Sequence, residues 1–257
     1  MQKTALLACS LSLVLAACAS TAPRESAGVS ESVAAAEAAA DAAHEAADQA
    51  GLMSVIEDPA RTAANRARDS YRHPFETLNF FQVRSASQVV EISPGGGWYA
   101  EILKPYLAAR GTYTASVGKP PAPGFAGPGN ADTILTFRNV HNWVAAGTAQ
   151  TYFDAFFEAL KSGGILGVVD HRAAPGTDLE TMKKSGYLTE DLVIAYAQKA
   201  GFVLEEKSEI NANPADTKNH PNGVWTLPPT NRHDAKDDAK YKAIGESDRM
   251  TLRFRKP

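Results

Sequence analysis

A glycine-rich turn between a strand and a helix is the feature that most constrains the fold of this chain. The β-branched run VVEI (89–92) leads directly into SPGGG (93–97). Apolar residues at helical spacing follow over 98–107, until Gly111 ends the helix. Glycines let a backbone approach a ligand, and the start of a helix offers unpaired N–H groups. The segment therefore predicts a ligand-binding edge, with a bare strand-to-helix connection as the alternative.

Further strands and helices alternate along the 257-residue chain. Apolar and β-branched patterns predict strands at 113–117, 133–137 and 165–169, helices at 151–160 and 189–200, and a final strand pair at 202–210 and 250–254. Thr189 is the expected N-cap of the helix at 189–200. Alternation of this kind is typical of an α/β fold, a mostly parallel sheet with helices on both faces. The last two strands have no helix between them, which predicts an antiparallel C-terminal pair.

Polar residues follow two of these strands at the edge where ligands of such sheets bind. The segment RNVHNW (138–143) follows the strand at 133–137, and Asp170, His171 and Arg172 follow the strand at 165–169. A histidine near neutral pKa is a natural general base, and Asp170 is placed to fix an imidazole of His141 or His171. The alternative is that these are hydrogen-bonded loop residues that cap strand ends.

Charge and motif content exclude several classes of function. The chain has 26 Lys and Arg against 29 Asp and Glu, a formal net charge of −3, which argues against nucleic acid as the main partner. There is no His-Glu-x-x-His motif and no histidine pair at i, i+4 spacing, so no metal is predicted. A hydrolase built on the histidines lacks the Gly-x-Ser-x-Gly turn.

The N-terminus has the pattern of an export signal. Lys3 precedes thirteen uncharged residues, 5–17, which are too few to span a membrane. The ending LAAC (15–18) resembles the lipobox of bacterial lipoproteins, which implies cleavage after residue 17 and a lipid anchor on Cys18. Because Ala19 is not an aspartate, the expected location is the cell envelope, at the periplasmic face of the outer membrane. An ordinary signal peptide with a chance cysteine is the alternative.

Residues 18–52 form an alanine-rich segment that predicts a linker or stalk. Acidic residues at helical spacing and many alanines favour a helix, while nothing is large enough to pack a core. An oligomerising helix is the alternative. The globular domain is expected at 53–257, with a long insertion at 211–249 that is expected to cover the binding site.

Four motifs together resemble an uncharacterised branch of the class I S-adenosylmethionine-dependent methyltransferases with exported members. They are VVEISPGGGWY (89–99), FRNVHNW (137–143), VDHR (169–172) and SEINAN (208–213), and the resemblance covers about 59–257. It implies the seven-stranded Rossmann-like methyltransferase sheet, S-adenosylmethionine as cofactor, and methyl transfer to a small molecule or an envelope component.

The resemblance also implies roles for individual residues. Those expected to bind the cofactor are Glu91, Ser93, Gly95, Gly96, Gly97 and Asn139. Those expected at the catalytic centre are His141, Asn142, Asp170 and His171. Those expected at the substrate or in a lid are Arg72, His73, Glu76, Trp143, Arg172 and Trp225.

Two departures from the family pattern define the alternative function. The segment TYTASV (112–117) lacks the carboxylate that holds the ribose in such enzymes, and 118–132 is too short and proline-rich for another helix and strand. The alternative is a binding or accessory lipoprotein that keeps the methyltransferase fold without its chemistry.

Overall fold

The computed structural model describes residues 25–120 and 129–257, in two units at 1–45 and 46–257. The described part of the first unit belongs to helix α1 (Glu25–Ile56), whose side chains over 33–45 are exposed. Cys18 and the export signal lie outside the described residues. Among the described helices, none is both long and apolar enough to cross a bilayer.

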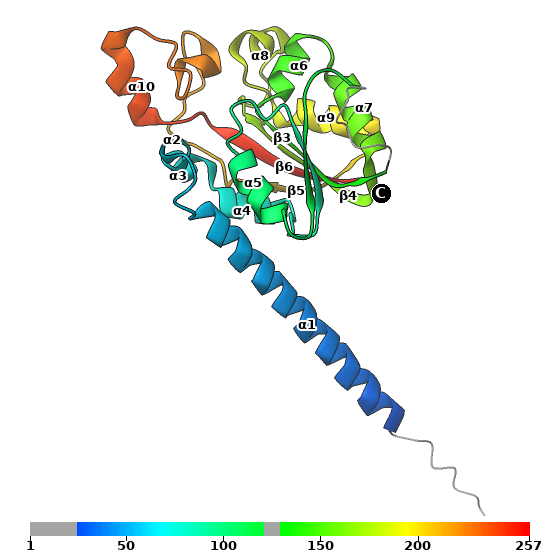
Figure 1. Cartoon of the computed structure of the whole chain (residues 1–257). Helices are drawn as coiled ribbons and strands as arrows, with labels where there is room; N and C mark the ends of the chain where they lie inside the picture. The colour runs from blue at the N-terminus through cyan, green and yellow to red at the C-terminus, as the bar shows by residue number, and fades with distance from the viewer. Residues whose placement is uncertain (1–24, 121–128) are drawn as a thin grey trace, which may run out of the picture. The chain divides into compact units, whose positions relative to one another are not determined.

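The second unit is organised by a mixed sheet in the order β2-β1-β3-β4-β6-β5 (Figure 1). Its strands are β1 (Gln88–Ile92), β2 (Thr112–Ser116), β3 (Ala131–Phe137), β4 (Leu160–His171), β5 (Val203–Ser208) and β6 (Arg249–Arg255). The first four are mutually parallel, and β6 is antiparallel to both β4 and β5. The prediction of a mostly parallel, Rossmann-like sheet with an antiparallel C-terminal pair is confirmed.

The sheet differs from the family pattern in its number of strands. The resemblance implied seven strands, whereas the described residues form a six-stranded sheet. Strand β2 ends at Ser116 and strand β3 begins at Ala131. The connection between them is therefore short, and it contains four prolines. The shortness of this connection was visible in the sequence, and it accounts for the missing strand.

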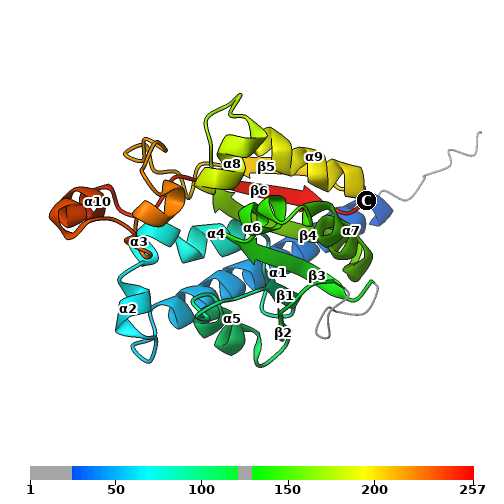
Figure 2. The same cartoon turned by 90° about the horizontal axis from the view of Figure 1, so that it is seen from above.

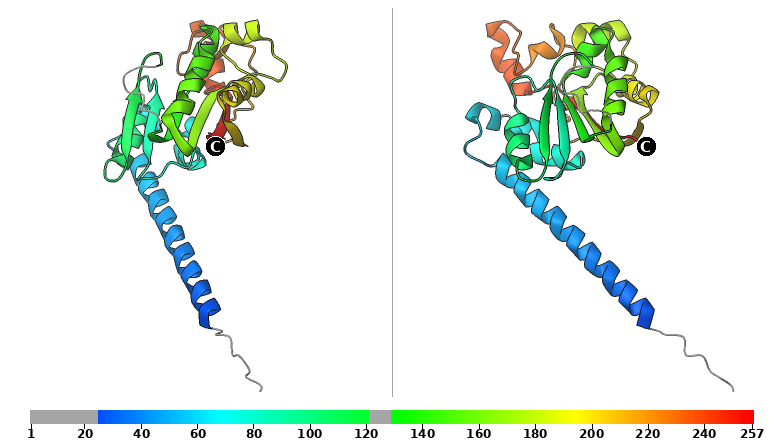
Figure 3. Two further views of the ribbon diagram at one scale, coloured as in Figure 1. Left: turned by 90° about the vertical axis from the view of Figure 1, so that its right-hand side faces the viewer. Right: turned by 45° about the vertical axis from the view of Figure 1, so that its right-hand side comes forward.

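Helices cover both faces of the sheet (Figures 2 and 3). The last turns of α1 pack with α4 (Pro74–Phe80) and α5 (Ala100–Leu107) on one face, around Leu52, Leu103 and Phe81. The other face carries α6 (Val140–Ala145), α7 (Ala149–Ala159), α8 (Leu179–Ser185) and α9 (Glu190–Ala200). The short helices α2 (Ala63–Arg66) and α3 (Asp69–Arg72) precede α4.

The boundaries of several elements depart from the sequence predictions for local reasons. The helix expected at 151–160 is α7, which ends at Ala159 because Leu160 is extended and pairs with Ala131. Strand β4 therefore begins five residues before the predicted 165. The predicted cap of α9 is confirmed, since the Thr189 hydroxyl accepts the N–H of Leu192 at 3.4 Å.

The long segment between β5 and β6 is ordered without being a sheet element. It contains the 3₁₀ turns η1 (Gly223–Thr226) and η2 (Ala235–Asp237) and the helix α10 (Asp238–Ile244). Figure 1 shows α10 apart from the helices that cover the sheet. The η1 turn lies nearer the sheet edge, and its residues line a cavity described below.

Candidate functional site

The strand order creates one switch point, between β1 and β3. The connection from β1 leads to β2 on one side, and the chain then returns to place β3 on the other side of β1. Ligands of open α/β sheets bind in the crevice beyond such a point. A cavity of about 190 Å³ lies there, and its lining includes Glu91, Ser93, Gly95, Gly96, Arg138 and Asn139.

The glycine turn leaves its backbone open to this cavity. Gly95 and Gly97 have φ of +58° and +77°, conformations that side chains rarely adopt. A Cβ atom built on Gly95 or Gly96 would meet no atom within 4 Å. The Asn139 amide donates to the Ile92 carbonyl at 2.8 Å and so ties the end of β3 to the end of β1. The turn is thus held from one side and accessible from the other.

Glu91 lies buried at the end of β1, next to the turn. Its carboxylate accepts the Tyr113 hydroxyl at 2.8 Å. Burial raises the pKa of Glu91 to about 7, although the bond from Tyr113 and the charge of Arg72 act in the opposite direction. A carboxyl group that titrates near neutrality beside a cavity can hold or release a proton there.

Four arginines surround one carboxylate behind the cavity. Glu246 contacts Arg68 at 2.6 Å, Arg72 at 3.3 Å and Arg249 at 3.1 Å. Arg138 also acts on Glu246 through its charge. Burial and the neighbouring Arg138 lower the pKa of Arg72 to about 10. The cluster therefore carries more buried positive charge than negative charge in contact with it.

A second cavity, of about 220 Å³, lies beside the first and contains the predicted histidines. Its lining includes Arg138, His141, Asn142, His171 and Trp225. The Nδ1 atom of His141 lies 2.8 Å from Asp170 Oδ1, and the two histidine rings are 5.0 Å apart. The predicted proximity of His141, Asp170 and His171 is confirmed.

Each histidine is oriented through its Nδ1 atom. Asp170 is fully buried and accepts the backbone N–H of His141 at 3.2 Å and of His171 at 2.7 Å, besides the His141 ring. His171 Nδ1 bonds the Ser247 hydroxyl. Burial, with the charges of His141 and Arg138, holds the pKa of His171 well below its ordinary value, so this ring is neutral.

The same residues form a candidate metal cluster within the described chain, because ligand atoms of His141, Asp170 and His171 lie within 4.8 Å of one another. Both Asp170 oxygens already accept N–H bonds. Such bonds do not prevent a carboxylate from binding a metal, but the orientation of His141 and His171 accounts for the buried Asp170 without one. We therefore assign this cluster no metal.

Several predicted residues lie elsewhere. Trp143 is buried in the core, where its ring stacks on Tyr152 with centroids 4.0 Å apart. Glu76 is exposed in the first turn of α4. His73 lines a separate cavity with Asn211 and Arg249. Arg72 lines the first cavity and Trp225 the second, so the structure joins these two to the predicted site.

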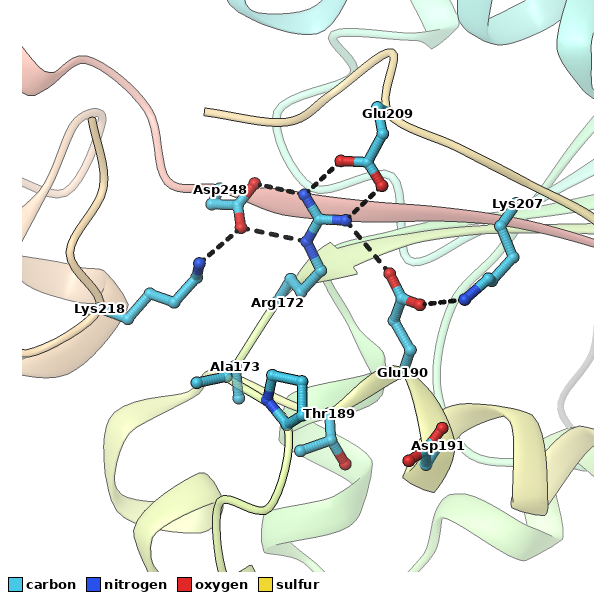
Figure 4. Close-up of a pocket in the computed structure, with 11 residues that line it drawn as sticks. Arg172, Ala173, Thr189, Glu190, Asp191, Lys207, Glu209, Lys218 and Asp248 are labelled. Carbon is cyan, nitrogen blue, oxygen red and sulfur yellow. Dashed lines mark hydrogen bonds and ion pairs between the residues drawn. The ribbon is translucent and has the colours of Figure 1, made fainter. Parts of the chain in front are cut away.

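Arg172 lies in another pocket, of about 510 Å³, where it is at the centre of a network of ion pairs (Figure 4). Its guanidinium donates to both Glu209 oxygens at 2.7 Å, to Asp248 at 2.9 and 3.1 Å, and to Glu190 at 3.2 Å. Lys218 and Lys207 complete the network on Asp248 and Glu190. This network joins the ends of β4 and β5 to the start of β6.

The site also contains residues that the sequence did not identify, and Arg138, which the sequence placed at the ligand edge without assigning it a role. Glu246, Ser247, Asp248 and Arg249 are each 3% exposed, although they form an unbroken polar run. Such a run directly before an alternating strand is the signal that could have pointed to them. Arg138 directly follows β3, and its position between the two cavities emerges only in three dimensions.

Comparison with known proteins finds likeness to solved structures and none at the level of sequence. No family model and no curated protein matches the sequence. Three similar solved structures are an S-adenosylmethionine-dependent methyltransferase from Aquifex aeolicus, 15% identical with TM-score 0.45; the [4+2]-cyclase SpnF, 13% identical with TM-score 0.49; and geranyl diphosphate methyltransferase in complex with S-adenosylmethionine, 10% identical with TM-score 0.44.

These matches extend over most of each protein. They cover 64%, 78% and 80% of this chain and 93%, 86% and 95% of the respective neighbours. The assignment of the fold rests on the strand order and pairing described above.

Proposed function

We propose that the chain is an S-adenosylmethionine-dependent methyltransferase whose cofactor binds at the glycine turn. The observation that carries the proposal is the open backbone of Gly95 and Gly96 at the switch point of the sheet. Backbone N–H groups in such a turn are available to a ligand that approaches closely. When bound, this cofactor supplies an electrophilic methyl group.

The residues present fit such a ligand at the turn. The backbone at Gly95 and Gly96 and the side chains of Glu91 and Ser93 would hold it. At the neighbouring end of β2, the buried Ser116 hydroxyl has no hydrogen-bond partner among the described residues. A buried polar atom without a partner costs free energy unless a ligand or water completes it.

His141 is the residue placed to serve the methyl acceptor. Asp170 binds its Nδ1 atom, which fixes the ring and leaves Nε2 for a group in the second cavity. From there Nε2 can take a proton from an acceptor hydroxyl or amine. Because methyl transfer to a good nucleophile requires mainly alignment, we expect Asn142 and His171 to contribute through positioning.

A calorimetric titration of S-adenosylmethionine and its demethylated product into the purified chain tests the proposal. We expect micromolar binding by the wild type and loss of binding in Gly95→Arg. Gly176→Arg is the matched control, because Gly176 also has positive φ, of +79°, and open space around it. Absence of binding up to millimolar ligand in a folded protein would contradict the enzyme proposal.

A second candidate function is supported by the end of β2. The strand offers Ser116 and no carboxylate to the ribose position of the family pattern. The absence of this carboxylate supports a protein that has the fold and binds an envelope ligand without catalysis. The same titration separates the two functions, because only the enzyme requires the cofactor.

We further propose that the protein is exported and anchored by a lipid on Cys18. The sequence LAAC at 15–18 supports this proposal. Labelled palmitate should be incorporated into the wild type and into Cys9→Ser, but not into Cys18→Ser. Equal labelling of all three proteins would refute the anchor.

A further inference from the structure

Arg138 is shared by the two cavities of the site. It lines the cavity at the glycine turn together with Asn139, and it lines the histidine cavity together with His141. Its backbone is held by an N–H bond to the Val169 carbonyl at 2.7 Å, with φ of +61°. An unusual backbone conformation at a strand end, in a residue other than glycine, costs free energy and is frequent at binding sites.

The Arg138 guanidinium has no bonded partner in the described chain. No hydrogen bond or ion pair from a described residue reaches it. Burial lowers the pKa of Arg138, while the charges of Glu246 and Asp170, which it does not bond, act in the opposite direction. Within the same described part, Arg72 Nη2 and Arg249 Nε are buried without a hydrogen bond. Unpaired buried charge is costly. An anionic group bound at Arg138 would remove this cost.

Aromatic rings form part of the wall of the histidine cavity, beside polar side chains. Trp225 and Val224 of η1, with Pro228 and Pro229, line it together with the rings of His141 and His171. The Trp225 and His141 ring centroids are 6.1 Å apart. Aromatic faces favour planar partners. At about 220 Å³ the cavity lies below the range of about 300–1,000 Å³ that drug-sized ligands occupy, so its ligand is small.

We propose that the histidine cavity binds the methyl acceptor, and that this acceptor is a small planar acid whose anionic group bonds the Arg138 guanidinium. The proposal rests on the proposed methyltransferase function and names its substrate class. The acid is held with its ring against Trp225, which places its nucleophilic atom near His141 Nε2. The guanidinium without a bonded partner and the aromatic wall thus have a single occupant.

Calorimetry with three probes and the full chain tests the charge and the shape separately. Benzoate is a planar acid, benzamide is its neutral analogue, and cyclohexanecarboxylate is an acid of similar size without a planar ring. We expect benzoate to bind at least about tenfold more tightly than benzamide, because only benzoate carries a charge that Arg138 can bond. A tenfold difference in Kd corresponds to about 1.4 kcal/mol of binding free energy. We expect cyclohexanecarboxylate to bind at least about threefold more weakly than benzoate.

Variants assign these preferences to residues. Arg138→Gln should abolish the preference for benzoate over benzamide. Arg138→Lys should retain part of this preference, because lysine keeps the positive charge but lacks the paired N–H donors with which a guanidinium binds both oxygens of a carboxylate. Arg110→Gln is the control, since Arg110 is exposed on another surface, and it should bind as the wild type does. Trp225→Leu should abolish the preference for the planar ring.

Two outcomes of the benzoate and benzamide titrations would overturn the proposal. One is equal or undetectable binding of benzoate and benzamide by a folded wild type; the other is an unchanged preference in Arg138→Gln. Titration of S-adenosylmethionine into Arg138→Gln distinguishes the sources of the anion. Unchanged cofactor affinity assigns Arg138 to the acceptor, whereas a tenfold loss together with retained benzoate binding assigns it to the cofactor and overturns the proposal.

The two proposals can fail independently. Benzoate binding by a protein that does not bind S-adenosylmethionine would refute the methyltransferase and leave the acid-binding cavity. Cofactor binding without any benzoate binding would refute the acceptor assignment alone.

Discussion

Two arginines at neighbouring strand ends have opposite environments. Arg138 follows β3 and Arg172 follows the end of β4, and these strands pair in parallel. Arg172 is bonded by three carboxylates, and its hydrogen bonds with Glu209 raise its pKa (Figure 4). Arg138 has no bonded partner among the described residues, and burial lowers its pKa. Equivalent positions in the sheet thus carry one satisfied and one unsatisfied guanidinium.

The difference separates structure from function. The pocket at Arg172 is larger, at about 510 Å³ against about 220 Å³ for the histidine cavity. Its charges are already used to join β4, β5, α9 and β6, so a ligand would have to compete with ion pairs. We propose instead that a ligand completes the bonds that the protein leaves open at Arg138. The feature that marks the proposed site is a guanidinium without a bonded partner among the described residues, and not the volume of the cavity.

Removal of the Glu246 carboxylate should have the largest effect on stability. Glu246→Gln leaves Arg68, Arg72 and Arg249 facing one another without their counter-charge. Breaking a buried ion pair in this way costs about 3–5 kcal/mol. We expect that loss in the free energy of unfolding, measured by urea denaturation at pH 7.

Glu180→Gln is the control for this measurement. Its side chain is 82% exposed in a pair with Lys183, and such pairs contribute little. A loss in Glu246→Gln no larger than that in Glu180→Gln would mean that the arginine cluster is not held by its carboxylate. The arginines near the first cavity would then not depend on a counter-charge for stability, unlike Arg172 in its network.

Glu91 offers a pH-dependent test of the charge in the first cavity. Burial raises its folded pKa to about 7 from 4.5, so the folded state binds the proton more tightly than the unfolded state. This contribution to stability is complete below about pH 4.5 and is lost as the pH rises through about 7.

In Glu91→Gln this titration is absent. The variant should match the wild type near pH 4.5 and become more stable above pH 7, by up to about 3 kcal/mol at 1.36 kcal/mol per unit of pKa. Thermal or urea unfolding across this range measures the difference. A difference independent of pH would show that Glu91 is ionised throughout and already offsets the charge of Arg72.

The parts of the fold that the sequence predicted are those set by local patterns. The strand at 89–92, the turn, and the cap at Thr189 each depend on a few consecutive residues. The six-residue helix α6 was not predicted, because so short an element has too few turns to show a period. That omission explains the error at Trp143. A loop residue there could face a ligand, whereas the helix turns Trp143 into the core against Tyr152.

The sequence predicted those residues of the candidate site whose position follows from the ends of neighbouring strands. The meeting of His141, Asp170 and His171 followed from the parallel sheet, since residues after neighbouring strands lie at one edge. The arginine cluster could not be predicted this way. Arg72 and Glu246 are 174 positions apart, and their contact depends on how the segment before β6 folds back onto α3. No periodicity or motif encodes that contact.

The comparison between Arg138 and Arg172 is tested most directly by replacing each of them with methionine. The expected changes in the free energy of unfolding are the smallest of those predicted. Arg172→Met leaves the buried Asp248 with Lys218 and the backbone N–H of Asn213, and we expect a loss of about 2 kcal/mol in the free energy of unfolding. Arg138→Met removes a charge that no described residue bonds, so we expect no loss and a gain of up to about 1 kcal/mol. Binding should respond inversely, with benzoate affinity lost in Arg138→Met and retained in Arg172→Met. Equal destabilisation by the two substitutions would show that Arg138 is paired within the protein, and a ligand would then have no unsatisfied charge to complete.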